Sequence, residues 1–166
     1  MLTLKKRRQR GIGLLELMLS ISIIAILLVM ATRYYMSTKQ SQQESDAVSQ
    51  VMGIVSGGAN YALGNNNSYS NMSLLALVQG GYVPGSFCGS GSGSSCGSDA
   101  SPWHTSLSVA AGSANSNYVI TIAAIPATNV CTTTAALVNN SIQNTQLGGT
   151  SSNAVCSGNS LVVTVY

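Results

Sequence analysis

The chain of 166 residues has the length of one ordinary domain with room for an appendage. Charged residues make up only 7% of it and hydrophobic residues 45%, which excludes a disordered, highly charged chain. The formal net charge of +3 would suggest an anionic partner, yet five of the seven basic residues lie within the first ten positions. No Lys or Arg follows residue 39. The rest of the chain therefore cannot build a phosphate-binding surface, and we expect no direct contact with nucleic acid.

A nearly unbroken apolar run, Ile12–Thr32, follows the basic cluster. As a helix, these 21 residues would be about 31 Å long, enough to cross the core of a bilayer. Five basic residues precede the run and only two, Arg33 and Lys39, follow it, which predicts a cytoplasmic N-terminus. Beyond the run, the helical pattern continues without Gly or Pro as far as Gly53.

Two simpler interpretations of this segment fit less well. A secretory signal peptide has a shorter apolar region and a cleavage site between small residues, and neither is present. A plain single-span anchor leaves Glu16 unexplained, because a charge at bilayer depth costs roughly 2.5–3.5 kcal/mol. No basic residue lies one helical turn later, where Leu19 and Ser20 stand. The partner of this carboxylate must therefore come from elsewhere.

The segment KKRRQR-Gly11, followed by Ile12-Gly13-Leu14-Leu15-Glu16, resembles the leader and helix start of the type IV pilin family. The resemblance implies cleavage between Gly11 and Ile12 by a prepilin peptidase, which also N-methylates the new amine of Ile12. It implies further that Glu16 faces the N-terminal amine of a neighbouring subunit in a filament. Pairing these two charges relieves the cost of burying each, so the pair would mainly set how neighbouring helices align along the filament.

Several residues indicate a subclass within that family. Ile12 stands where many members have Phe or Met, Gly13 replaces the usual Thr or Ser, and Arg33 stands where the short-leader branch often has Pro. The stretch from Asn66 to Pro84 is similar to the one that follows the first helix in the long-leader branch. We therefore favour a type IVb-like pilin.

Two helices are expected after the apolar run. Gln43–Leu63 predicts an amphipathic continuation that packs on a sheet, with one face formed by Val48, Val51, Met52, Val55, Ala59 and Ala62. A short helix is predicted at Met72–Gln79, capped by Asn71 and stopped by Gly80-Gly81.

Three strands are expected, at Ser106–Ala111, Tyr118–Ile125 and Leu161–Tyr166, because these stretches are rich in β-branched or aromatic residues. Thr132–Ile142 is predicted to be a short helix or an irregular loop. The expected fold is α+β, with a long N-terminal helix packed on a small antiparallel sheet, as the resemblance also implies. The expected parts are a cleaved leader (1–11), a transmembrane or filament-core helix (12–35) and an exported head (36–166).

All four cysteines, Cys88, Cys96, Cys131 and Cys156, lie in the part expected to be exported. An even count in an oxidising compartment implies disulfides, and four cysteines allow three pairings. We favour Cys88–Cys96 and Cys131–Cys156, of which the second resembles the C-terminal disulfide loop of pilins. We expect no metal and no cofactor, because the chain has no CxxC motif and a single histidine.

The sequence contains no convincing catalytic constellation. His104 could combine with Asp99 and a serine, but the chain has no GxSxG nucleophile elbow. A lone loop histidine is more often a solvated surface residue, and the Gly/Ser run at 89–93 lacks a nucleotide-binding pattern. We therefore expect that the protein is not an enzyme.

The expected function is a structural subunit of a type IV pilus, which moves from the bacterial inner membrane into an extracellular adhesive or motility fibre. The implied partners are copies of itself, the prepilin peptidase, the pilus assembly platform and the outer-membrane secretin.

A rival function is that of a type II secretion pseudopilin. We disfavour it because calcium binding requires clustered carboxylates, and Asp99 is the only carboxylate side chain after residue 46. The remaining rival functions are those of a minor, conjugative or DNA-uptake pilin, a single-span membrane-anchored binding protein and a membrane-anchored enzyme.

Overall fold

The computed structural model describes residues 13–91, 93–113, 115–145 and 152–166. The chain divides into two units, one ending at Gln40 and the other beginning at Ser41. In chain order the elements are α1 (Leu14–Gly64), α2 (Leu74–Gln79), the 3-10 turns η1 (Gly85–Cys88) and η2 (Gly93–Ser95), β1 (Leu107–Ala111), β2 (Tyr118–Ile122), α3 (Thr128–Thr145), β3 (Asn153–Ser157) and β4 (Ser160–Val165).

Helix α1 belongs to both units. It runs for 51 residues without a proline, and its N-terminal part is rich in Leu, Ile, Met and Ala, mostly good helix formers. In the first unit, the large apolar side chains from Leu14 to Met30 are between 50% and 81% exposed. A helix that is apolar all round must be covered by lipid or protein, so this part of α1 requires an environment other than water.

The second unit contains an antiparallel four-stranded sheet in the order β1-β2-β4-β3. One row of directly opposed residues crosses all four strands and is buried throughout; it consists of Val109, Ile120, Val163 and Ala154. Side chains alternate between the faces of a strand, so this row shows that a single face of the sheet carries the core. Strands β3 and β4 are joined by a two-residue turn in which Gly158 has a φ of 61°, a conformation glycine adopts freely.

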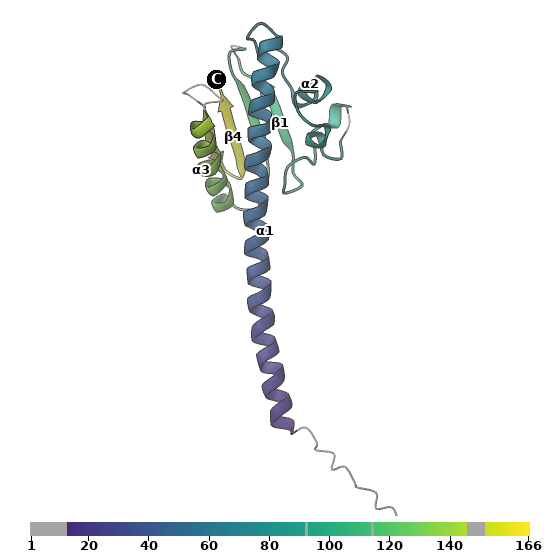
Figure 1. Cartoon of the computed structure of the whole chain (residues 1–166), viewed down its shortest axis with the longest axis vertical. Helices are drawn as coiled ribbons and strands as arrows, with labels where there is room; N and C mark the ends of the chain where they lie inside the picture. Colours follow the sequence, from purple (N-terminus) through teal and green to yellow (C-terminus); the bar gives the residue numbers. More distant parts are fainter. Residues whose placement is uncertain (1–12, 92, 114, 146–151) are drawn as a thin grey trace, which may run out of the picture. The chain divides into compact units, whose positions relative to one another are not determined.

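The C-terminal half of α1 packs on the sheet through a buried stripe that includes Val51, Ile54 and Val55. Figure 1 shows this half of α1 crossing in front of the sheet. The hydroxyl of the fully buried Tyr118 donates to the carbonyl of Val55 at 3.4 Å. Burial raises the pKa of the Tyr118 phenol well above its ordinary value, and the neighbouring phenol of Tyr69 adds to the effect. The phenol is therefore a neutral part of the core.

Helix α3 lies beside β3 and β4, whereas α2 lies beside β1 (Figure 1). Both edges of the sheet are engaged by the chain itself. At the β1 edge, the Leu107 N–H donates to the carbonyl of Gly97 at 2.7 Å, and Ser73 forms an isolated bridge with Ala110. At the β3 edge, Asn139 on α3 hydrogen-bonds the backbone of Ala154. An edge engaged in this way offers fewer free backbone groups to a foreign strand.

The structure confirms the α+β class, the long N-terminal helix and the small antiparallel sheet. The buried face of the C-terminal half of α1 differs from the predicted one by about one position. Ala47, Val51, Ile54 and Val55 are buried, whereas Val48, Met52 and Ala59 are only half-buried, because the face turned to the sheet is centred one position away.

Several predicted boundaries were wrong. The strand predicted over Tyr118–Ile125 ends at Ile122, because Ala124 has a φ of 53° and the Ile125 N–H bonds instead to the carbonyl of Asn159. Helix α2 is capped by Ser73, whose side chain accepts from the Ala76 N–H, and not by Asn71, which has a φ of 60°.

The predictions for two elements near the C-terminus were wrong or incomplete. Strand β3 was not predicted, and the segment predicted as a short helix or loop is the 18-residue helix α3. A buried stripe supports α3; it consists of Val130, Cys131, Thr134, Ala135, Val138 and Ile142.

Candidate functional site

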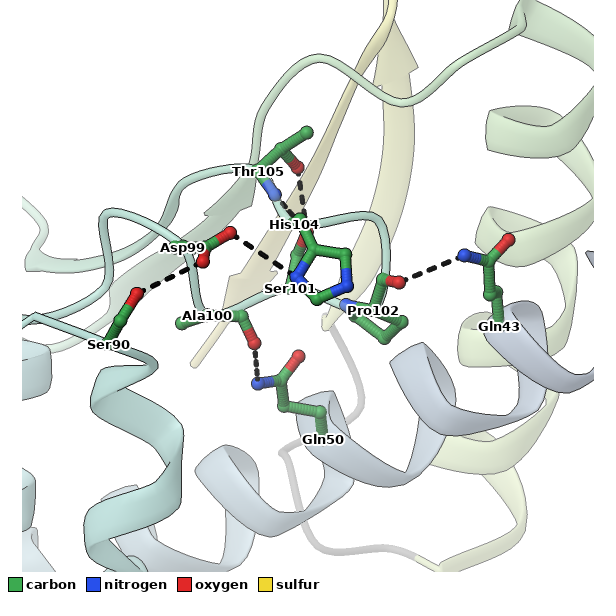
Figure 2. A network of polar contacts seen from close by, with 9 residues as sticks. All are labelled: Gln43, Gln50, Ser90, Asp99, Ala100, Ser101, Pro102, His104 and Thr105. Carbon is green, nitrogen blue, oxygen red and sulfur yellow. Dashed lines mark hydrogen bonds and ion pairs between the residues drawn. The ribbon is translucent and has the colours of Figure 1, made fainter.

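A loop of the second unit, residues 99–105, is held on α1 by two glutamines (Figure 2). The Gln43 side chain donates to the carbonyl of Pro102 at 3.0 Å, and the Gln50 side chain donates to the carbonyl of Ala100 at 2.7 Å. The two glutamines are seven residues apart and therefore lie on one face of the helix. This face fixes the loop at two points.

The chain's only histidine belongs to this loop. Figure 2 shows Asp99 between Ser90 and His104. Ser90 Oγ donates to Asp99 Oδ2 at 3.0 Å, and His104 Nδ1 lies 3.5 Å from Asp99 Oδ1. A hydrolytic triad needs the histidine between serine and carboxylate, so that it can take the serine proton. Here the carboxylate occupies the middle place, and His104, with its side chain 83% exposed, lies on the surface.

A shallow cavity of about 350 Å³ lies beside the loop, lined by Asp46, Ser49, Gln50, Ser86, Phe87, Ala100, Ser101 and Pro102. Most of the polar groups that line it are used within the fold: Ser101 Oγ bonds to Thr105 Oγ1 at 2.7 Å, and Gln50 Nε2 donates to the carbonyl of Ala100, whereas Gln50 Oε1 is buried without a hydrogen-bond partner. Asp46 is its only ionisable residue. The cavity thus lacks the convergent charged groups of a catalytic centre.

The cysteines form two disulfides in the structure, Cys88–Cys96 and Cys131–Cys156, the pairing favoured from the sequence. The first closes the loop that contains Ser90, and the second joins α3 to β3. All four sulfurs are used in this way, and the described residues contain no group of three or more metal-ligating side chains.

In the first unit, Glu16 lies in the first turn of α1. The N–H groups of Glu16 and Leu17 donate to the carbonyl of Gly13 at 3.0 and 3.2 Å, and these bonds start the helix. A carboxylate in the first turn is favoured by the helix dipole. Gly11 and Ile12, the residues of the expected cleavage site, lie outside the described part of the chain.

The other polar side chains of this apolar segment bond to the helix itself. Ser20 donates to the carbonyl of Glu16 at 2.8 Å, Ser22 to that of Leu19 at 2.7 Å, and Thr32 to that of Val29 at 3.0 Å. Hydroxyls satisfied in this way are tolerated in an apolar environment. Glu16 is the only charged residue from Gly13 to Thr32, and its side chain is exposed. It therefore stands out as the one group here that needs a cation from outside the segment.

A family model, the prokaryotic N-terminal methylation motif, matches residues 6–32. The chain carries the class III signal peptide of type IV pilins. The match includes Gly11, Ile12 and Glu16 and ends where the apolar run ends. Searches of curated proteins and of solved structures found no match.

This signal supports a precursor of the type IV pilin-like or pseudopilin kind. Among the described residues, α1 is the one helix long and apolar enough to cross a membrane. The signal and this helix together indicate a membrane-anchored precursor. The two findings concern the same stretch of chain, which is the best candidate for the functional site.

Sequence reasoning found Glu16 because a charge interrupts an apolar pattern. It missed Gln43, Gln50 and Asn139, whose side chains hold loops and edges in place. A polar residue on an amphipathic helix is ordinarily a solvated one, and nothing in the local pattern distinguishes these three. Only the long-range contacts to Pro102, Ala100 and Ala154 reveal them.

Proposed function

We propose that this protein is a structural subunit of a type IV pilus. It is made as a precursor in the bacterial inner membrane, with its N-terminus in the cytoplasm. A prepilin peptidase cleaves it between Gly11 and Ile12 and methylates the new amine. The subunit then polymerises through its N-terminal helix into an extracellular fibre. The observation that carries this proposal is the methylation motif at residues 6–32, which coincides with the apolar N-terminal part of α1, where Glu16 is the only charged residue from Gly13 to Thr32.

The exposed apolar side chains fit a helix that moves from lipid in the precursor to a protein core in the fibre. Side chains that are at least half exposed from Leu14 to Met30 need lipid around them in the precursor and other protein after extraction. Copies of the same helix supply such a cover, as in a bundle packed around a common core. A protein that merely stayed anchored would need only the first environment.

Glu16 supplies the specificity that apolar packing lacks. Cleavage after Gly11 would create a positively charged amine at Ile12, and in an assembled fibre the amine of a neighbouring copy can pair with the Glu16 carboxylate. Each group alone is costly in an apolar core, and together they relieve one another. The pair would thus favour one register between neighbouring helices without adding much net stability.

The charge of the mature chain also fits assembly. Loss of residues 1–11 removes five basic residues and leaves Arg33 and Lys39 against four acidic residues, a side-chain net charge of −2. After residue 46 the only remaining charge is Asp99, which is engaged by Ser90 and His104. Heads with so little charge can pack closely without strong repulsion. The role is structural and not catalytic.

A pseudopilin is the second candidate, because its precursor would carry the same kind of signal. We favour the pilus because calcium binding in the head would require several carboxylates, and the sequence after residue 46 has one. The pilus assembly platform and an outer-membrane secretin are the partners that the proposed route requires.

The experiment is to express wild type and Glu16→Ala in a bacterium that has a prepilin peptidase and an assembly system. Processing is followed by the mass of the membrane-bound chain, and fibres are followed by electron microscopy of sheared material. We expect Glu16→Ala to be inserted and processed but to yield few or no fibres. Ser20→Ala, one turn along and already satisfied within the helix, is the matched control and should assemble normally. Normal fibres from Glu16→Ala would refute the assembly role.

A further inference from the structure

Three polar residues, Arg33, Tyr34 and Tyr35, follow the apolar run directly. The two tyrosines are 77% and 68% exposed. Arg33 and Lys39 are also the only basic residues after position 10, so every cation outside the leader lies close to the end of the apolar run. The apolar run alone does not explain why an arginine and two exposed tyrosines lie together at its end.

The geometry of a helix distinguishes two kinds of partner for these residues. Successive positions turn by about 100° and rise by about 1.5 Å, so three consecutive residues cover about 200° of the circumference within about 3 Å along the axis. Residues that contact a single partner helix recur instead every three or four positions on one face. Arg33, Tyr34 and Tyr35 therefore form a partial ring at one depth, which suits a flat surface crossed by the helix.

The chemistry of the ring suits the head-group layer of a bilayer. Tyrosine places an apolar ring against acyl chains and a hydroxyl among head groups, and it is enriched at this boundary. The guanidinium of arginine can bind a phosphate with two hydrogen bonds while its stem stays in apolar surroundings. The hydroxyls of Thr32 and Thr38, on either side of these residues, bond to the helix backbone at 3.0 Å each. The guanidinium and the two phenols are thus the side-chain groups at this level best placed to meet lipid.

We propose that Arg33, Tyr34 and Tyr35 bind phospholipid head groups at the outer face of the inner membrane and thereby fix the depth of the precursor. This inference rests on the proposed function, since it requires that the helix spans the membrane before assembly.

The fixed depth has a consequence for Glu16. It lies 17 positions before Arg33 in the same helix, about 26 Å along the axis, close to the full thickness of a hydrocarbon core of about 30 Å. A ring held at the outer boundary therefore keeps the carboxylate near the inner boundary, where water lowers the cost of its charge. It also keeps the Gly11–Ile12 bond at the cytoplasmic face, where the peptidase must reach it.

The test measures depth with tryptophan fluorescence in the full-length precursor, reconstituted into vesicles of phosphatidylcholine and phosphatidylglycerol. The lipids are brominated either near the head group or deep in the chains. Tyr34→Trp reports on the ring and Ile23→Trp on the middle of the apolar run, and the signal of the native Trp103, measured in wild type, is subtracted. We expect Tyr34→Trp to be quenched several-fold more by the shallow label and Ile23→Trp several-fold more by the deep one.

The control separates failure of the ring from failure of the proposed function. If Ile23→Trp is quenched by the deep label but Tyr34→Trp is quenched by the deep label or by neither, the ring is refuted and the membrane span stands. If neither variant is quenched by any lipid, the span itself is refuted, and the ring with it.

A functional readout follows from the same idea. The triple variant Arg33→Ala, Tyr34→Ala and Tyr35→Ala should be cleaved several-fold more slowly by the peptidase in vesicles. The control pair Ser37→Ala and Thr38→Ala, just beyond the ring, should be cleaved at the wild-type rate. Equal cleavage rates for the two variants would overturn the role of the ring in presenting the cleavage site.

Discussion

The side-chain amide of Asn139 on α3 exchanges two hydrogen bonds with the backbone of Ala154 on β3. Asn139 Nδ2 donates to the Ala154 carbonyl at 2.8 Å, and the Ala154 N–H donates to Asn139 Oδ1 at 2.7 Å. A residue of a neighbouring antiparallel strand would form the same two bonds. The amide thus replaces a fifth strand at one point of the sheet edge and ties α3 to it.

Replacing Asn139 with Ala should lower the free energy of unfolding by about 1–3 kcal/mol, because two backbone groups of Ala154 lose their partner. Urea unfolding of the detergent-solubilised protein, followed by the fluorescence of the single, buried Trp103, measures this. Asn140→Ala is the matched control, since Asn140 is exposed, and its effect should stay within about 0.5 kcal/mol. Equal losses for the two variants would contradict the edge-closing role of Asn139.

Gly57 lies in α1 where the chain after α2 approaches the helix. A Cβ at this position would lie 2.5 Å from Val83 Cγ1 and 2.9 Å from the Tyr82 carbonyl oxygen. Gly57→Ala should therefore destabilise the head by about 1–3 kcal/mol, although alanine is the better helix former. The exposed Asn60→Ala, in the same part of α1, should be neutral or slightly stabilising in the same urea experiment. A stabilising Gly57→Ala would show that the close approach is not needed.

The two disulfides should differ in their contribution to stability. Cys131–Cys156 links residues 25 positions apart, whereas Cys88–Cys96 links residues 8 positions apart. Closing the longer loop removes more conformational entropy from the unfolded chain. Cys131→Ala with Cys156→Ala should cost roughly 3–4 kcal/mol, and Cys88→Ala with Cys96→Ala roughly 2–3 kcal/mol. Thermal and urea unfolding of the two double variants compare them directly. A larger loss for the short loop would show that the loop-entropy argument fails here.

The parts of the fold that follow from the sequence are those with a strong local pattern. The apolar run and its helical continuation predicted α1, and β-branched residues predicted β1, β2 and β4. Glu16 could be singled out because one charge in an apolar segment has no local explanation. The processing site at Gly11 and Ile12 was predicted from resemblance, and the methylation motif covers both residues.

The missed parts depend on contacts between distant residues. Strand β3 has the sequence NAVCS with only Ala154 buried, and it is a strand because it pairs with β4. Helix α3 is rich in Thr and Asn, which are poor helix formers, and it is stabilised by apolar side chains such as Val138 that pack in the core. Asn71 looked like a helix cap by residue type, but its positive φ moves the cap to Ser73. Local preference could not reveal these tertiary effects.

The central claim is that the N-terminal segment is a processed assembly element and not a permanent anchor. The most direct test is the intact mass of the chain extracted from sheared fibres and from inner membranes of the same cells. We predict a chain that lacks residues 1–11, begins at Ile12 and carries the added mass of one methyl group. A chain that retains residues 1–11 in both fractions would contradict the account.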